Sequence, residues 1–273
     1  MTERRTSIPT DGFLSDGAEY WRKVHEKRAF EWFEIARDLN RFGHQLRSLI
    51  ETGTPPAPQH LYLSGLLFLR ALSTFQASIL LANYGLVTDA GTLVRSTLED
   101  FLLLGMLEKD PAFAVSMMRA DALQEKKKLR GLLNLPSDLG LSPGRVEKLQ
   151  RYVESFPDDL SDIKFDQIAR KAGIGHMYDT YYRGLSHTSA HPNIQALTRH
   201  TSFDHQGNAT GFCYGPDVPK DEIMQIVAYA CAIFYCAIHS IITIYDDGTL
   251  LVKLDALYQR YSVMARRDFP EIT

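Results

Sequence analysis

The stretch LYLSGLLFLRALSTFQASILLANYGLVTDAGTLVRSTLEDFLLLGML, residues 61–107, decides the fold that the sequence predicts. Its apolar residues recur at helical spacing from Leu61 to Leu81 and again from Thr88 to Leu107. Between these runs stands Asn-Tyr-Gly at 83–85, and a glycine after a helix is a common C-terminal signal because it lacks a Cβ atom. We therefore expect two antiparallel helices joined by a short turn.

The composition is that of a folded protein. The 273 residues are 45% hydrophobic and 23% charged, which allows one large core or two modest ones and gives no sign of disorder. A formal net charge of −3 excludes a general attraction to nucleic acid or anionic lipid, so any RNA binding needs a local basic patch. The richest basic run is EKKKLR at 125–130, whose simplest interpretation is a solvated helix face.

The chain is expected to work in the cytoplasm. Its first residues, MTERR, lead into polar and proline-containing sequence instead of the apolar core of a secretory signal. The cysteines Cys213, Cys231 and Cys236 are odd in number, and two of them lie in an apolar run where a small thiol packs well. Both features favour a reducing compartment.

Upstream of the hairpin, the sequence predicts a separate arm. A long amphipathic helix is expected from about Asp16 to Ile50. The segment TGTPPAP at 52–58 then ends it, because three prolines in four residues cannot continue a helix. We expect an N-terminal helical arm with a Pro-rich linker at 1–58 and a helical core domain at 59–273.

Downstream of the hairpin, helical patterns dominate. His205-Gln206-Gly207-Asn208 interrupts an alternating segment from Leu197 to Tyr214 and predicts a short β-hairpin. Helices are expected over 110–133, 145–156, 165–176, 177–190, 221–245 and 249–264. The predicted fold class is all-α, a multi-helix bundle with an antiparallel helical hairpin at its centre and one short β-hairpin insertion.

One predicted helix is long enough to cross a membrane. Ile223 to Tyr245 contains 23 residues without Asp, Glu, Lys or Arg. Acidic residues flank both ends, no Lys/Arg cluster marks a cytoplasmic side, and Gln225 and His239 lie inside the run. We expect a buried central helix and no membrane partner, with a transmembrane span as the alternative.

Charged residues are predicted inside the apolar hairpin. A turn near Gly85 brings Arg70 level with Glu99 and Asp100, and Arg95 precedes Glu99 by one helical turn. We expect a carboxylate held between two guanidinium groups. Its simplest role is a structural ion pair that fixes the helix register, because buried charges must be paired.

The segment YYRGLSHTSAHP at 181–192 is where chemistry could concentrate. On a helix, Arg183, His187 and His191 fall in one stripe, which aims two titratable rings and a positive charge at one volume. Pro192 places His191 at or just past the helix end.

Four interpretations of this segment are open. The two histidines could bind a metal with a third ligand from Glu99 or Asp100. Alternatively, a histidine and an arginine could act on RNA, the histidine as general acid or base and the arginine on the phosphate. Ser186 could be a nucleophile, although adjacent residues on a helix point about 100° apart. The fourth interpretation is a satisfied structural cluster that locks the segment against the 88–107 helix.

Common cofactor motifs are absent from the sequence. It contains no phosphate-binding loop of the Walker type, no Gly-x-Gly-x-x-Gly, no Cys-x-x-Cys, no His-Glu-x-x-His and no Gly-x-Ser-x-Gly. We therefore expect no cofactor and no resident metal.

Short motifs resemble those of a bacterial all-helical family of unknown function. They are GLVTDA at 85–90, RSTLE at 95–99, YRGLS at 182–186 and HP at 191–192, and the resemblance covers roughly 61–245. It implies an all-helical fold and a pairing of the Arg-x-x-x-Glu helix with the Ser-to-His segment, and it implies no established activity.

A more distant similarity is to HEPN-type helical proteins of toxin–antitoxin and phage-defence systems. Some of these cut RNA with an arginine followed by four to six residues and a histidine. Here three residues separate Arg183 from His187, and seven separate Arg183 from His191.

The working hypothesis is a cytoplasmic helical bundle with a polar pocket that acts as a defence-linked or stress-linked, ribonuclease-like or anion-binding protein. The partners would be RNA or another protein, and we expect a homo-oligomer. The alternative is a non-enzymatic interaction or dimerisation module. Catalytic roles are predicted for Glu99, Arg183, His187 and His191, and binding or supporting roles for Arg70, Arg95, Tyr182 and Ser186.

Overall fold

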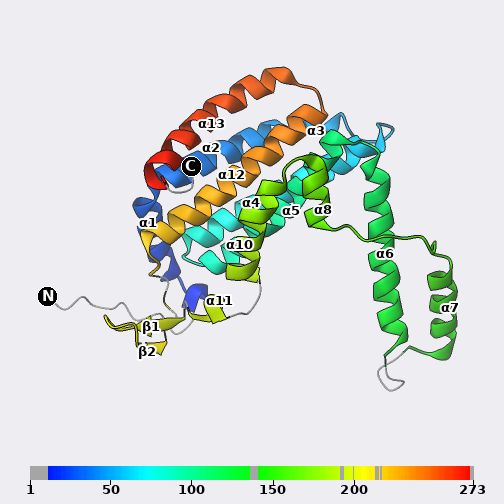
Figure 1. Ribbon diagram of the computed structural model, residues 1–273, viewed down its shortest axis with the longest axis horizontal. Coiled ribbons are helices and arrows are strands. Elements are labelled where there is room, and N and C mark those ends of the chain that lie inside the picture. Colours follow the sequence, from blue (N-terminus) through cyan, green and yellow to red (C-terminus); the bar gives the residue numbers. More distant parts are fainter. Residues whose placement is uncertain are drawn as a thin grey trace.

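The structure is a computed structural model that describes residues 12–135, 141–190, 194–198, 200–212, 215 and 217–270. It is mostly helical with one small sheet, which confirms the predicted fold class (Figure 1). The α-helices are α1 (Ala18–Arg28), α2 (Phe30–Gln45), α3 (Arg47–Glu51), α4 (Gln59–Asn83), α5 (Val87–Lys109), α6 (Phe113–Leu133), α7 (Pro143–Glu154), α8 (Phe165–Ala172), α9 (Gly175–Met177), α10 (Arg183–Leu185), α11 (Ile194–Thr198), α12 (Lys220–Ile244) and α13 (Gly248–Asp268). A short 3₁₀ helix, η1 (Gly12–Leu14), precedes them, and two π-helical turns, η2 (Tyr178–Tyr182) and η3 (Ser186–Ala190), flank α10.

The predicted hairpin lies at the centre of the bundle. α4 and α5 pack antiparallel, and Gly85 adopts a φ of 84° in the turn between them, a conformation that glycine reaches without Cβ strain. α12 packs against both helices, and its Phe234 ring stacks on that of Phe75 with centroids 4.3 Å apart. These three helices form the core onto which the other elements pack.

A second layer of helices covers α12. α2 and α13 pack along it, and the three run close together in Figure 1. α2 also contacts α4, where the Gln76 amide donates to Asn40 at 2.8 Å. Trp32 of α2 joins these elements, because its indole nitrogen donates to Asp268 at 2.9 Å and its ring packs on Tyr261 and Phe269. The α2 side chains therefore belong to the main core.

The predicted single helix from Asp16 to Ile50 is wrong, because the chain bends twice there. Ala29, with φ −121° and ψ 37°, separates α1 from α2, and Leu46 separates α2 from α3. The first bend lets α1 reach the hairpin turn, where His25 Nδ1 donates to the Asn83 carbonyl at 3.0 Å, while α2 turns its apolar face to the core. The division of the chain at Pro58 stays a prediction.

Two long helices are apolar enough to cross a membrane by length and composition. They are α4 and α12, and in its most apolar stretch α12 is 67% buried whereas α4 is 44% buried. Burial of this kind is typical of a core helix, as expected for the 223–245 run.

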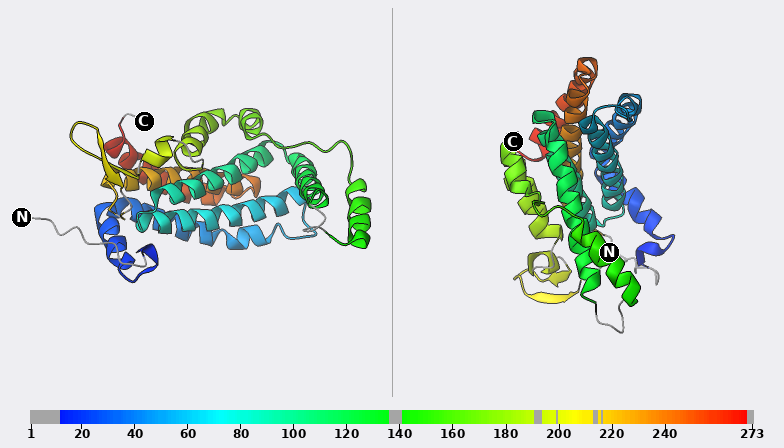
Figure 2. Two further views of the ribbon diagram at one scale, coloured as in Figure 1. Left: turned by 90° about the horizontal axis from the view of Figure 1, so that it is seen from below. Right: turned by 90° about the vertical axis from the view of Figure 1, so that its right-hand side faces the viewer.

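One part of the molecule projects from the bundle. α6 leaves the end of α5 at a steep angle and, with α7, stands away from the other helices (Figures 1 and 2). Residues of the EKKKLR run on α6 pair with the acidic segment that follows α7: Lys126 with Asp158 at 3.4 Å and Lys127 with Asp162 at 2.8 Å. We call α6 and α7 the arm.

The small sheet lies near the opposite end of the bundle. β1 (Thr201–Phe203) and β2 (Ala209–Phe212) form an antiparallel pair around the predicted turn, with Thr201 opposite Phe212. Tyr214 and Cys213, at the end of the predicted hairpin, lie outside the described residues.

Candidate functional site

The segment from Gly175 to Ala190 runs along α5 as a series of short helical turns. The sequence predicts a plain α-helix here, but Tyr178–Tyr182 and Ser186–Ala190 are π-helical. A π-helix closes its hydrogen bonds from residue i to i+5 and is frequently found at functional sites. The rings of Tyr178 and Tyr182 stack at 4.7 Å within the first π-turn.

The inner side of the segment is tied to α5 by Tyr182. The Tyr182 hydroxyl accepts a hydrogen bond from Arg95 Nη2 at 2.5 Å and donates one to Glu99 Oε1 at 3.2 Å. Arg95 and Glu99 also form an ion pair at 3.1 Å, and the Arg95 guanidinium lies 4.5 Å from the centroid of the Tyr182 ring. We call these three residues the inner triad.

The inner triad is largely shielded from water. The Arg95 and Glu99 side chains are 22% and 20% exposed, and the Phe165 ring of α8 packs 6.0 Å from that of Tyr182. Burial raises the pKa of Tyr182, the hydrogen bond from Arg95 opposes this, and the Glu99 carboxylate raises the pKa further. Tyr182 therefore stays a neutral phenol that donates to Glu99.

Ser186 lies on the inner side, one turn after Tyr182. Its hydroxyl oxygen is buried, and among the described residues it has no hydrogen-bond partner. Arg95 Nε is also buried and has no hydrogen-bond partner among the described residues. Neither atom contacts a described histidine, so the described contacts do not form the base-activated pair that a Ser186 nucleophile needs.

Arg183 and His187 lie on the outer side of the segment. The Arg183 side chain is 65% exposed, and its Nε is 3.2 Å from Asp179 Oδ1, one turn earlier. Its guanidinium also lies 5.8 Å from the centroid of the Tyr178 ring. The His187 side chain is exposed as well, whereas His191 lies outside the described residues.

The predicted site residues that the structure describes therefore do not form a single cluster. Arg95, Glu99 and Tyr182 come together, with Ser186 on the same side of the segment. Arg183 and His187 are both exposed on the outer side, where Arg183 pairs with Asp179.

Arg70 belongs to another ion pair on the same hairpin. Its Nη1 is 3.2 Å from Asp100 Oδ1, and its Nη2 donates to Ser96 at 3.0 Å. The predicted carboxylate between two guanidinium groups is therefore wrong, because Arg70 and Arg95 each take their own carboxylate. Asp100 is fully buried, and this burial raises its pKa to about 7 although Arg70 opposes the rise.

Close contact with the Ser189 side chain brings the segment onto α5. A Cβ atom at Gly91 would lie 2.3 Å from Ser189 Oγ, so a larger residue there would require the Ser189 side chain to shift. The Thr92 hydroxyl donates to the Ser189 carbonyl at 3.2 Å beside it. This contact was not predicted from the sequence, and neither was Asp179, although the four-residue spacing of Asp179 and Arg183 is a usable ion-pair signal.

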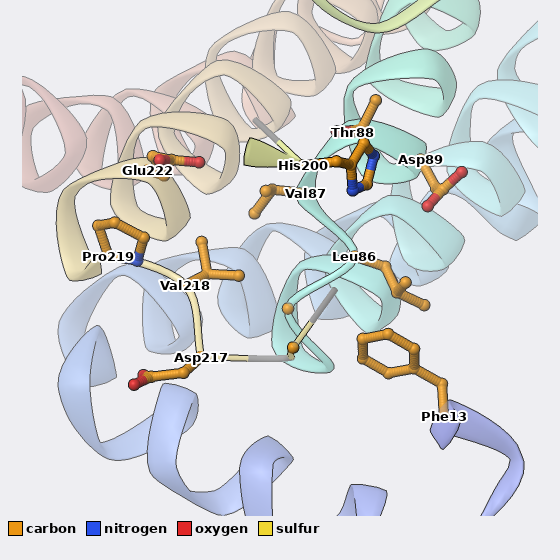
Figure 3. A pocket seen from close by; sticks show the side chains of 12 residues that line it. Phe13, Leu86, Val87, Thr88, Asp89, His200, Asp217, Val218, Pro219 and Glu222 are labelled. Atoms are coloured by element: carbon orange, nitrogen blue, oxygen red, sulfur yellow. The ribbon is translucent and has the colours of Figure 1, made fainter. Parts of the chain in front are cut away.

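A cavity of about 340 Å³ lies beside the hairpin turn, where α5 and α12 begin (Figure 3). Its walls combine apolar Phe13, Leu86 and Val218 with His200 and Glu222. None of the predicted site residues that the structure describes lines it. Among the described residues, no group of three or more His, Cys, Asp and Glu side chains is placed to hold a metal ion.

Comparison with known proteins gives a family without an assigned activity. A family model described as a family of unknown function, DUF5677, matches residues 61–209, which include the hairpin, the arm and the whole 175–190 segment. No match was found among curated proteins or solved structures.

Proposed function

The chain belongs to this family of unknown function, DUF5677, and we propose that it binds RNA at the outer side of the 178–190 segment and cleaves it without a metal ion. The observation that carries the proposal is the pair of exposed side chains, Arg183 and His187, on a segment whose inner side is held by Tyr182. A guanidinium suits a phosphate, and imidazole is the common proton-transfer group near neutral pH.

The charge of the segment around Arg183 and His187 favours the binding of an anionic ligand. Between Lys164 and His187 the chain has four Lys or Arg residues and two Asp residues, together with two histidines, whereas the whole chain is net negative. The Lys164, Arg170 and Lys171 side chains are exposed, as is Arg183. A phosphate backbone would therefore meet positive charge on this side of the molecule.

The proposed chemistry uses the ribose hydroxyl as nucleophile. One histidine, His187 or His191, removes the 2′-hydroxyl proton, and the 2′-oxygen attacks the adjacent phosphorus. The bond from phosphorus to the 5′-oxygen breaks, and that oxygen takes a proton from the other histidine. Arg183 stabilises the charge on the phosphorane. The products are a 2′,3′-cyclic phosphate and a 5′-hydroxyl end.

The inner triad has a positioning role in this proposal. Glu99 and Arg95 hold Tyr182, and Tyr182 fixes the turn that carries Arg183. The HEPN-type proteins that the sequence distantly resembles also use an arginine and a histidine, although with a different spacing. The activity would fit a defence or stress function in a bacterial cytoplasm, which a growth assay on induction of the gene can examine.

The test is cleavage of end-labelled single-stranded RNA by the full chain in the presence of EDTA. We expect cleavage by the native protein and a loss of about 100-fold or more for His187→Ala and for His191→Ala. Arg183→Ala should weaken both binding and cleavage. Matched controls are His205→Ala in the β-turn and Arg151→Ala on α7, exposed residues that should leave the rate unchanged. No cleavage by the native protein, or equal rates in all variants, would reject the proposal.

A second candidate function is a non-enzymatic interaction module. The outer side of α4, which exposes several large apolar residues, favours it. The two functions are compatible, since this surface does not include the 178–190 segment.

A further inference from the structure

The outer side of α4 is unusual for a surface helix. Tyr62, Leu66, Leu69 and Leu80 are 40% to 60% exposed, and Arg70 is the only Lys, Arg, Asp or Glu between Gln59 and Asn83. By contrast, the outward-facing helix α13 has six such residues between Gly248 and Asp268. A surface helix with four large exposed apolar residues and a single charged one is typical of a buried interface.

The exposed residues follow the spacing of helix pairing. Six positions alternate at four and three residues along one side of α4, as in a two-helix seam: Tyr62, Leu66, Leu69, Ser73, Gln76 and Leu80. Gln76 is the half-buried member of this set, and its amide nitrogen donates to Asn40 of α2 at 2.8 Å. The single charged residue beside them, Arg70, is already paired with Asp100 on α5. Nothing in the strip requires a charged partner, so its partner should be apolar.

We propose that this strip binds the same strip of a second copy, which makes the protein a symmetric dimer with antiparallel α4 helices. The strip is self-complementary about the helix midpoint, at Ala71. A two-fold axis there places Leu69 against Ser73 of the partner subunit, and Leu66 against Gln76 of the partner subunit. Tyr62 meets Leu80 of the partner subunit. A large side chain thus lies opposite a small or polar one near the axis, which lets two helices interdigitate.

The arm favours a second copy of the chain over a membrane as the partner of the α4 strip. Seen from below in Figure 2, α4 and α5 lie in front of α12, and α6 projects from this same side toward the viewer. α6 has 21 residues and is therefore about 31 Å long. A flat bilayer could not reach α4 past a projection of that length, whereas another copy of an L-shaped molecule can fit into the corner.

The arm also supplies area that α4 alone lacks. Two 25-residue helices in contact share a strip about 37 Å long and roughly 10 Å wide, under half of the about 800 Å² per subunit that stable interfaces bury. At the corner, Gln59 of α4 contacts Met118 of α6, and Val115 and Met118 are about half exposed. These residues extend the strip, so the corner between α4 and α6 of each copy contacts the end of α4 of the other copy.

The test is the mass of the full chain in solution by light scattering and sedimentation. We expect twice 30.9 kDa for the native protein. Leu66→Glu with Leu69→Glu should weaken association by at least about 100-fold, because four carboxylates would meet near the axis. The matched control is Val252→Glu, an exposed valine on α13 that should leave the dimer intact.

A crosslink covers the case in which the double variant fails to fold. Ser73→Cys should form a dimer with a short bis-maleimide, since two copies of residue 73 lie about one helical turn apart in the proposed register. Val263→Cys on α13 should give only the background level of the native protein, in which Cys231 is buried and Cys236 is half-buried. A native monomer, a dimer that survives both glutamates, or binding of neutral-lipid vesicles through Leu66 and Leu69 would each overturn the proposal.

Discussion

Tyr182 is the residue through which the histidine segment is attached to the hairpin. Replacing it with phenylalanine keeps the stacked ring and removes the hydroxyl that Arg95 and Glu99 share. We expect Tyr182→Phe to lower the free energy of unfolding by about 1 to 3 kcal/mol, because two partly buried charged groups lose a partner. Urea denaturation measures the change.

A double-mutant cycle separates this contact from general packing. Glu99→Gln alone should weaken the same contact, and the two changes together should cost less than the sum of the single changes by about 0.5 kcal/mol or more. Strict additivity would mean that Tyr182 and Glu99 do not interact. Arg41→Gln, whose ion pair with Asp38 is surface-exposed, is a suitable control and should change stability by under about 1 kcal/mol.

Asp100 makes stability depend on pH in an unusual direction. Burial raises its pKa to about 7, above the ordinary value of an aspartate. Between the two values the folded state retains a proton that the unfolded state has lost, so the free energy of unfolding falls as pH rises from about 4 to 7. The full effect is on the order of 4 kcal/mol, from about three pKa units. It is absent at pH values below the ordinary pKa and complete above pH 7.

Asp100→Asn should therefore flatten the dependence of melting temperature on pH over that window. The difference between the native protein and the variant isolates Asp100 from the histidines, which both proteins share. Parallel melting curves from pH 4 to 8 would show that Asp100 ionises normally in the folded protein. The Asp221→Asn variant, which changes an exposed aspartate, should behave like the native protein.

Residue spacing predicted some of these contacts and missed others. Arg95 and Glu99 pair because they stand one turn apart, and Arg70 reaches Asp100 because the turn at Gly85 sets the heights of the two helices. The outward direction of Arg183 was not predictable, since it depends on the π-helical turns around it. A four-residue spacing is compatible with both an α-helix and a π-helix.

At the scale of elements, the contact between η3 and α5 depends on Gly91. In an open helix position, Gly91→Ala would stabilise the protein by about 1 kcal/mol through helix propensity. Here the new methyl would lie 2.3 Å from Ser189 Oγ and 3.0 Å from its Cβ. We expect a net loss of about 1 to 3 kcal/mol from overpacking, measured by thermal or urea unfolding.

The background of Ser189→Gly provides the control for this prediction. Removing the Ser189 side chain removes the clash, so adding Gly91→Ala to that variant should raise stability instead of lowering it. A stabilising effect of Gly91→Ala in the native background would contradict the close approach. Gly131→Ala on α6, where nothing lies within 4 Å of the added Cβ, should follow helix propensity alone.

Sequence patterns predicted some boundaries of the helices and not others. No glycine or proline marks the break at Ala29. The break arises from two tertiary contacts, because His25 reaches Asn83 while Trp32 enters the core. The turn at Gly85 was predictable because a φ of 84° selects glycine. Local chemistry therefore located the hairpin turn, whereas long-range packing decided the bend.

At the scale of the whole molecule, periodicity was enough for the central bundle. Continuous apolar runs predicted that α4, α5 and α12 form the core, since such helices have to be buried. The projecting arm was not predictable, because helical periodicity gives no information about how far a helix stands from the others. The inner triad was predictable only as a pairing of two distant motifs, and its separation from Arg183 and His187 depends on the path of the chain around α5.

The relation of residues 1–58 to the rest of the chain can be tested by truncation. Trp32, Phe33 and Ile35 of α2 are at most 1% exposed, and they pack into the core formed by α12 and α13. Removing α2 would expose that side of α12, at a cost of about 2 to 3 kcal/mol for each large apolar residue left uncovered. This sum is comparable to the whole stability of a typical domain. We therefore expect the fragment 59–273 to lose cooperative thermal unfolding.

A pair of point variants makes the same test without shortening the chain. Trp32→Ala should destabilise the protein by about 3 to 5 kcal/mol, since it leaves a large cavity. The same variant also leaves the Asp268 carboxylate without the indole hydrogen bond. Phe30→Ala on the same helix, where the side chain is 56% exposed, should change stability by about 0.5 kcal/mol or less. A cooperative 59–273 fragment together with a mild Trp32→Ala variant would instead mean that the N-terminal segment is an independent arm, with the core of α12 closed in some other way.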